Sequence, residues 1–410
     1  MDNLIGSFFL LLLFLLILLF TKKYPYSTNF LLIAFFLRTI IVILTEYDLI
    51  RLPDDTGDAT KFEYTARLFS RDDGLLILKD FFKPDSFLIS RIISIFYIVF
   101  GESTMVAKGI SVALGTASVY LTYLLGLLLW DHNSAKKGAW IVALFPTLIL
   151  YSTITLRETY IVFFLLMGLI NIAKFIKEYS LNSFLFAIFN FYILSLFHGP
   201  VAIGIFVFFT YLAFTMLITE IIKLYKLRLN KKTFLYLIFL SSIFYLILNS
   251  QITIPYIGTL KGTIKIFTEL NLITTKLNVH ISDIASYPSW LIINNTNEFY
   301  TKSIIKIFYF IYSPFVWDVK TPIHILGLLD SVFYMILTIY LIQNWRAIWE
   351  NPMTRVIVLI LIFYFIVYGI SVGNFGTAIR HRSKFVVMLI VLAAPKIHKF
   401  IFLTKNKIYK

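Results

Sequence analysis

Four carboxylates lie close together between residues 51 and 69, in the sequence RLPDDTGDATKFEYTARLF. They belong to Asp54, Asp55, Asp58 and Glu63, in a chain of which only 14% of the residues are charged and 59% are hydrophobic. A carboxylate at a low-dielectric boundary acts as a base toward a hydroxyl or amine, or holds a divalent cation, because desolvation and neighbouring acids raise its pKa and its attraction for metal. The cluster therefore predicts acid–base or cation-binding chemistry, with a solvated loop and an Asp helix cap as the alternative.

An amphipathic helix is expected to follow these acids at residues 60–69. Phe62, Ala66 and Phe69 recur there at helical spacing, and Tyr64 lies near the middle. We expect Asp58, which is nearest to this helix, to matter most among the acids. Asp54 is expected to be a solvated bystander.

A second acid, Glu158, follows Arg157 within LYSTITLRETYIVFF, at the boundary between two apolar runs. The pair is read in two ways. Glu158 is a second acidic ligand and Arg157 a phosphate-binding partner, or the pair is an arginine that reaches the membrane edge beside a glutamate.

A basic cluster closes the set of candidate residues, in GNFGTAIRHRSKF at residues 373–385. Arginine binds phosphate through two parallel hydrogen bonds and lysine adds a point charge, so Arg380, Arg382 and Lys384, with His381 between them, suit the phosphate or pyrophosphate of a lipid. His198, which precedes Gly199, is either a ligand or a histidine at a helix end.

The composition identifies the environment of these residues. A mean hydropathy of +0.84 over 410 residues leaves too little polar surface for a soluble protein, so we expect an integral membrane protein. The formal net charge of +15 comes from lysines and arginines clustered between apolar runs, which indicates topology and not nucleic-acid binding. The absence of cysteine excludes disulfides, thiolate metal sites and a cysteine nucleophile.

The predicted fold class is an all-α polytopic membrane protein with about eleven transmembrane helices and interfacial amphipathic helices in the extracytoplasmic loops. The shorter apolar stretches 87–100 and 304–317 are read as the interfacial helices. The predicted spans are Leu4–Phe20, Phe30–Leu44, Met105–Trp130, Ala139–Tyr151, Thr159–Ile172, Phe184–Phe197, Val201–Ile222, Phe234–Leu248, Ile323–Ile342, Val356–Ile370 and Phe385–Phe402.

The distribution of positive charge predicts the topology. With this set of spans, the basic loops around Lys22, Lys136, Lys174 and Lys223 fall on the cytoplasmic side, and the candidate residues share the extracytoplasmic face. We divide the chain into an N-terminal anchor with its cytoplasmic turn (1–28), a transmembrane core (29–250) whose first external loop (46–104) carries the acids, an extracytoplasmic loop with an interfacial helix (251–322), and C-terminal helices with the basic motif (323–410). Arg38 and Asp330 lie within predicted spans and are expected to face the interior, with Arg38 paired to an acid of the first loop.

These segments, taken in order, resemble the GT-C superfamily of membrane glycosyltransferases. The similarity is to the branch of protein mannosyltransferases and aminoarabinose transferases, which use polyprenyl-phosphate sugars at the extracytoplasmic face. The family's first core span and the opening of its first external loop resemble LLIAFFLRTIIVIL and GDATKFEYTARLF. Its interfacial helix and second core span resemble SIFYIVFGESTMVAKGISVALGTASVYL, and its second acidic motif resembles GAWIVALFPTLILYSTITLRETYIVFF. Its Arg-x-Arg segment resembles RHRSKFVVMLIVLAAP. The resemblance covers residues 30–176 well, the end of the chain loosely, and 180–370 only in hydrophobic layout.

The resemblance implies a role for each candidate residue. Asp58, or Asp55, is the base that takes the acceptor proton, Glu158 the second acid, and Arg380 and Arg382 bind the carrier phosphate. Tyr64, Arg157, His198, His381 and Lys384 are expected to bind substrate. A divalent cation, Mg²⁺ or Mn²⁺, would be held by Asp58 and Glu158 if one is used, since members with and without metal are both familiar.

The resemblance implies an enzyme of the cell envelope. It would be a multi-pass protein of a bacterial inner (plasma) membrane, with its active site on the extracytoplasmic side. Its partners are a polyprenyl-phosphate sugar, a glycan, lipid or protein acceptor and membrane lipids, with no nucleic acid. The chain lacks the large soluble C-terminal domain of the oligosaccharyltransferases of this superfamily, which argues against glycosylation of a protein sequon.

Two alternatives remain open. A repeat-unit polymerase or ligase of surface polysaccharide would depend mainly on Arg157, Arg380 and Arg382. A transporter or flippase of lipid-linked sugars would place its essential charges, such as Arg38 and Asp330, along a path through the membrane. No zinc-protease, Walker A, dinucleotide-binding or serine-hydrolase motif occurs in the sequence.

The topology predicts how single cysteines will react in this naturally cysteine-free chain. Positions 58 and 384 are expected on the extracytoplasmic side, so a cysteine at position 58 should react with a membrane-impermeant maleimide added outside, and a cysteine at 136 only after permeabilisation. Labelling of position 58 from the cytoplasmic side alone would contradict both the topology and the proposed chemistry.

Overall fold

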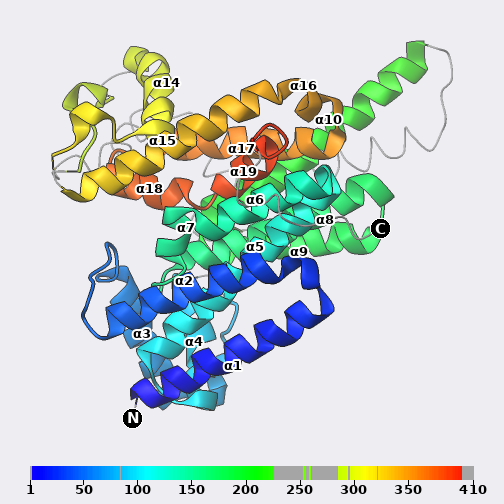
Figure 1. Ribbon diagram of the computed structural model, residues 1–410. Coiled ribbons are helices and arrows are strands. Elements are labelled where there is room, and N and C mark those ends of the chain that lie inside the picture. The colour runs from blue at the N-terminus through cyan, green and yellow to red at the C-terminus, as the bar shows by residue number, and fades with distance from the viewer. Residues whose placement is uncertain are drawn as a thin grey trace.

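The computed structural model describes residues 2–83, 85–225, 253–254, 258–259, 285–293, 296–320 and 322–398. Within these ranges the chain is mainly helical, which bears out the all-α prediction (Figure 1). The helices are α1 (Asp2–Lys23), α2 (Thr28–Glu46), α3 (Asp58–Leu68), α4 (Leu88–Phe100), α5 (Thr104–Leu129), α6 (His132–Leu144), α7 (Pro146–Tyr151), α8 (Arg157–Glu178), α9 (Leu181–Phe197), α10 (Ile203–Tyr225), α14 (Thr296–Tyr312), α15 (Pro322–Gln343), α16 (Trp345–Glu350), α17 (Pro352–Ser371), α18 (Phe375–Arg382) and α19 (Val386–Ala393). Strands β1 (Thr253–Ile254) and β2 (Gly258–Thr259) form an antiparallel pair.

Seven segments in the described part of the chain are helical, long and apolar enough to cross a membrane, so the protein is compatible with a multi-pass membrane protein. These segments are Asp2–Lys23, Pro25–Glu46, Thr104–Leu129, Arg157–Glu178, Gly199–Ile218, His324–Gln343 and Pro352–Ser371. The number of eleven is not confirmed. The predicted span Phe234–Leu248 lies outside the described residues. The last predicted span is described as far as residue 398, and the helix within it, α19, has eight residues.

The predicted span that ends at Tyr151 is divided into α6 and α7. Pro146 has no backbone N–H to donate, and a residue that precedes proline avoids helical dihedral angles, so Phe145 is extended. The break gives α7 its own N-terminus, and α7 then leads into the turn before α8.

The helices pack in chain order across the molecule. Helices α1–α4 form one side, α5–α9 the middle, and α14–α19 the other side (Figure 1). Helix α5 contacts α1, α2, α6 and α8, and its residues are mostly buried. Helix α1 instead exposes large apolar side chains such as Leu4, Phe8 and Leu11, as expected for a helix that faces lipid.

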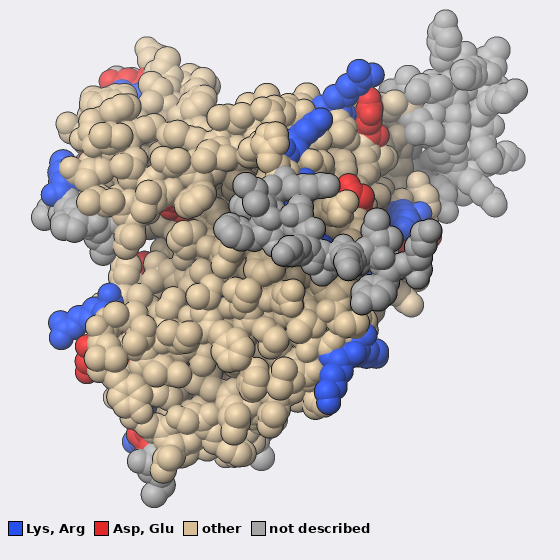
Figure 2. Space-filling view, in the orientation of Figure 1, with Lys and Arg blue, Asp and Glu red and all other residues tan. Residues whose placement is uncertain are grey.

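Charged side chains are concentrated toward the two ends of this bundle (Figure 2). Helices α3, α7 and α18 lie at one end, and the α1–α2 turn and α16 at the other (Figure 1). Figure 2 shows a broad uncharged band over the lower part of the visible face, with charged side chains toward both ends, and a notch at the end where α3 and α18 lie. A hydrocarbon layer around this band would leave both ends in polar surroundings.

The buried arginine of α2, Arg38, has other partners than predicted. Arg38 does face the interior, with 1% of its surface exposed, but its partner is not an acid of the first loop. Its Nε donates to Ser152 Oγ at 2.7 Å, and its Nη1 donates to the carbonyl oxygens of Ala34 and Ala143. Serine and carbonyl dipoles thus solvate the guanidinium in place of a counter-ion.

Arg382 and Asp330 form a buried ion pair that joins α18 to α15. Arg382 Nη2 lies 2.7 Å from Asp330 Oδ2, and the side chains are 0% and 1% exposed. Arg382 Nη1 also donates to the Ser313 carbonyl at 2.6 Å, and Asp330 accepts from Thr147 Oγ1 at 2.9 Å. Both charges are therefore compensated by partners from separate helices.

Removal of one member of this pair should destabilise the protein strongly. Arg382→Met leaves the Asp330 carboxylate buried without its counter-ion, which costs about 3–5 kcal/mol. We expect a large fall in the thermal denaturation midpoint, measured by fluorescence in lipid nanodiscs, and partial recovery in the double variant Arg382→Met/Asp330→Asn. The control is Arg346→Met, because the pair of Arg346 with Glu350 is exposed. If Arg382→Met were as stable as the wild type, the pair would have no structural role.

Candidate functional site

Three helix ends from distant parts of the chain meet at the end of the bundle that holds α3, α7 and α18. Helix α3 begins at Asp58, after Gly57 with a φ of 68°, a conformation that favours glycine. Helix α8 begins at Arg157, which puts Glu158 in its first turn, and α18 ends with basic residues in its last turn. Acids at helix N-termini and bases at a helix C-terminus are both favoured by the helix dipole.

Arg380 joins the two predicted acids. Its Nη1 donates to Asp58 Oδ2 at 2.9 Å and its Nε donates to Glu158 Oε1 at 2.8 Å. The Asp58 side chain is 48% exposed and that of Glu158 is 3% exposed. One guanidinium therefore links an acid at the surface to an acid in the interior, and the structure brings Asp58, Glu158 and Arg380 together.

Lys384 lies on the buried side of Glu158. Its Nζ is 3.4 Å from Glu158 Oε1 and 2.8 Å from His381 Nδ1. Burial lowers the pKa of Lys384 to about 8, although Glu158 opposes the shift. When charged, an ammonium group only donates, so Nδ1 of His381 accepts and Nε2 carries the proton. Burial, followed by the charge of Lys384, holds the pKa of His381 well below its usual value.

His198 and Arg157 complete one side of the site. His198 Nδ1 is 2.7 Å from the Tyr368 hydroxyl, and its ring centre is 5.2 Å from that of His381. Arg157 donates from Nη1 to the Phe197 carbonyl at 3.3 Å and lies 5.3 Å from the centre of the Phe62 ring. Among the described residues, Arg157 makes no ion pair with a carboxylate within 4.0 Å, so its guanidinium has donors to spare.

Two other acids of the first loop have partners at the edge of the site. Asp55 lies 3.0 Å from Lys108 Nζ of α5, and Asp54 accepts a hydrogen bond from the Tyr151 hydroxyl at 3.3 Å. Asp54 is exposed, as predicted, and its expected role as a bystander stays a prediction. Tyr64 is 64% exposed on the outer face of α3.

Arg382 does not point into the site, in contrast to its predicted role as a phosphate ligand. Its guanidinium is buried, paired with Asp330, and lies over the ring of Tyr334 at 4.8 Å. The cause is the helical geometry of α18, because residues two apart face different sides of a helix. Arg380 consequently faces Asp58, and Arg382 faces α15.

The predicted cation site has a guanidinium at its centre. Arg380 bonds to both Asp58 and Glu158, so a divalent cation held by these two carboxylates would have to replace Arg380. The described residues contain no group of three or more His, Cys, Asp or Glu side chains placed to hold a metal.

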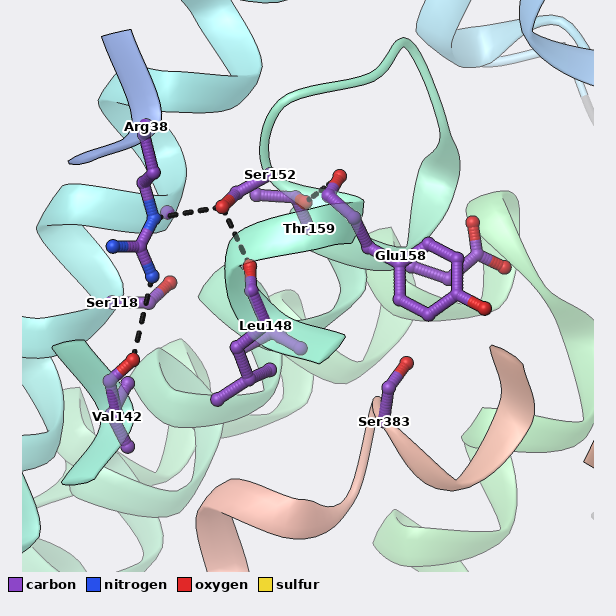
Figure 3. A pocket seen from close by; sticks show the side chains of 11 residues that line it. Arg38, Ser118, Val142, Leu148, Ser152, Glu158, Thr159 and Ser383 are labelled. Carbon is purple, nitrogen blue, oxygen red and sulfur yellow. Dashed lines mark hydrogen bonds between the residues drawn. The ribbon is translucent and has the colours of Figure 1, made fainter. Parts of the chain in front are cut away.

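A small cavity of about 10 Å³ lies beside Glu158. Its wall includes Arg38, Ser152, Thr159 and Ser383, and Figure 3 shows Ser152 between Arg38 and Glu158. Glu158 Oε2 is buried without a hydrogen-bond partner among the described residues. A volume of this size is about that of one water molecule, and most of its wall is apolar, with Val142, Leu148 and Val162 beside the polar groups.

A contact that was not predicted joins the two acid-bearing elements. Thr155 Oγ1 donates to Glu63 Oε1 at 2.5 Å, and Thr155 is fully buried. Glu63 belongs to the acidic cluster noted in the sequence, but its partner 92 residues away leaves no local signal. Tyr368 was also missed, because a tyrosine in an apolar span reads as core.

No protein-family model matches the sequence, and comparison with curated proteins finds no matching relative.

Glu63 should make stability depend on pH. Burial raises its pKa from 4.5 to about 7, although Thr155 and Lys108 oppose the shift. The folded state then binds the proton more tightly than the unfolded state, so the stabilising contribution is complete below about pH 4.5 and is lost as pH rises through about 7.

Glu63→Gln, a neutral isostere, should therefore raise the thermal midpoint relative to wild type at pH 8, and the difference should vanish near pH 4.5. Glu102→Gln is the control, because hydrogen bonds from Arg71 lower the pKa of Glu102 and the effect should not have the same sign. Equal midpoints of Glu63→Gln and wild type at pH 8 would contradict the assignment.

Proposed function

We propose that the protein is a membrane glycosyltransferase that moves a sugar from a polyprenyl-phosphate carrier to an acceptor at the extracytoplasmic face. The observation that supports this most is the meeting of Asp58, Glu158 and Arg380 at one end of the bundle. A transporter would need its charges along a path through the membrane. Here the charges of the site gather at an end where the surface is notched (Figure 2).

The two acids suit different tasks because their exposure differs. Asp58, at 48% exposure, is accessible to an acceptor hydroxyl and serves as the base. Glu158, at 3% exposure and close to two cations, holds Arg380 and Lys384 in place. The hydrogen bond between Arg380 and Asp58 must open before Asp58 takes the proton. Both side chains are partly exposed, which allows this bond to open.

The proposed step is a direct displacement at the anomeric carbon. The acceptor oxygen forms the new bond to this carbon and gives its proton to Asp58. The bond from the anomeric carbon to the phosphate oxygen breaks, and its electron pair leaves with the carrier phosphate. Cations placed at that phosphate stabilise the developing charge.

Arg157 is the proposed phosphate ligand, together with Arg380 after it leaves Asp58, while the buried Lys384 adds its charge from behind Glu158. Arg157 has spare donors, and arginine binds phosphate through two parallel hydrogen bonds. Arg382 is not included, because its donors are taken up by Asp330 and carbonyl oxygens. A divalent cation between Asp58 and Glu158 would need the place of Arg380.

Asp58→Asn tests the assignment of the base. The amide keeps the size of the side chain and an acceptor oxygen, but it does not take the acceptor proton, so transfer should fall about 100-fold or more. Membrane vesicles are incubated with a panel of radiolabelled undecaprenyl-phosphate sugars, and label that leaves the donor is measured by chromatography. Binding of undecaprenyl phosphate itself should stay within about twofold, because the basic residues are retained.

Asp72→Asn is the matched control, since Asp72 is an exposed acid of the same loop outside the site. Normal transfer by Asp58→Asn together with loss of transfer in Arg157→Ala would exclude Asp58 as the base and favour a repeat-unit polymerase.

A further inference from the structure

Helix α3 and the turn before α8 are joined by a side-chain hydrogen bond that the proposed chemistry does not use. Thr155 Oγ1 donates to Glu63 Oε1 at 2.5 Å. Glu63 follows Asp58 by five residues on α3, and Thr155 precedes Glu158 by three residues. The bond therefore ties together the two segments that carry the acids of the site.

We propose that Glu63 and Thr155 are positioning residues that hold Asp58 in register with Glu158 when Arg380 moves to the substrate. This inference rests on the proposed function. In the structure Arg380 itself bridges the two acids, but the proposed reaction requires that bridge to open at Asp58. A second link that does not contact the substrate would keep the acids in place through that step.

The other contacts of α3 do not provide the same link. Ser90 of α4 donates to the Phe62 carbonyl, and Arg67 donates to Thr104 of α5, so these bonds fix α3 to neighbours that carry neither Glu158 nor Arg380. Arg157 does reach from α8 to the ring of Phe62, but it is assigned to the carrier phosphate. Among the described contacts, the Glu63–Thr155 bond thus remains as a side-chain link from α3 to the turn before α8. Neither of its residues is proposed to bind substrate.

The bond is formed with Glu63 in either protonation state, because the hydroxyl of Thr155 donates and an oxygen of Glu63 accepts. The titratable groups around Glu63 are Lys108, Asp55, Arg67 and Tyr97. Glutamine at position 63 offers the same acceptor without charge. Retention of activity by Glu63→Gln and its loss in Glu63→Leu would separate the hydrogen bond from the charge.

Thr155→Val removes the donor with little change of shape, and the chain offers a matched control. Thr153 is also buried in the same turn, but its hydroxyl donates to the Leu150 carbonyl within that turn. Thr153→Val therefore removes a buried threonine hydroxyl and leaves the link to α3 intact.

The first measurement does not depend on enzymatic activity. Cysteines at positions 64 and 377, exposed sites on α3 and α18, carry spin labels in the cysteine-free chain, and their distance distribution is measured in nanodiscs. In an Arg380→Gln background, which opens the bridge to Asp58, we expect a broader distribution when Thr155→Val or Glu63→Leu is added, and an unchanged one when Thr153→Val or Glu63→Gln is added. An unchanged distribution on addition of Thr155→Val would overturn the proposal.

The second measurement is the transfer reaction. Thr155→Val should lower kcat about tenfold, with the KM for the undecaprenyl-phosphate sugar within about twofold, since the bond positions the base and does not touch the donor. A rise in KM with unchanged kcat would also overturn the positioning role. If the wild type transfers none of the sugars in the panel, the proposed function fails, and the distance distributions still decide whether the bond holds α3.

Discussion

The arrangement of the site depends on the guanidinium of Arg380, which bonds to carboxylates 222 and 322 residues away in the sequence. Each of the three side chains belongs to a helix end whose dipole favours its charge. The backbone dipoles of the three helices thus favour the charges of Asp58, Glu158 and Arg380 independently of the contacts among these side chains. A substitution that shifts any of these helix ends would act on the site without a change in its residues.

Burial divides the charged residues into two groups with different consequences. Glu158, Lys384 and Arg382 are almost fully buried, so each needs fixed partners and contributes to the register of the helices. Asp58 and Arg157 keep part of their surface exposed, so the proposed exchange of their contacts for substrate would cost less than at the buried residues. A rigid inner shell of this kind, with adaptable groups at the rim, is what precise positioning of a reacting group requires.

Apolar periodicity and helix signals were sufficient to predict several elements. The expected helix at 60–69 is found as α3, at Asp58–Leu68, with Phe62 and Ala66 buried. The partners of charged residues were harder to predict, because they come from distant segments. Arg38 bonds to Ser152 and carbonyl oxygens, and Arg382 to Asp330, although each had been given a different partner. Helix rotation decides which of two neighbouring basic residues faces the site, and one sequence does not specify it.

The ion pair of Asp330 and Arg382 has a consequence for the order in which the protein is made. Asp330 lies within a candidate membrane span, and its counter-ion is 52 residues further along the chain. Because the chain is made from its N-terminus, α15 is complete before the arginine that pairs with its carboxyl group has been added. A charged aspartate costs about 2.5–3.5 kcal/mol at the centre of a membrane helix on insertion scales, and less away from it. Asp330 lies on the N-terminal side of the centre, so α15 carries part of this penalty, or a proton, until Arg382 pairs with it. Docking of α18 thus supplies the counter-ion of Asp330 only after both helices have been made, so the last helices of the bundle complete the electrostatic balance of an earlier one.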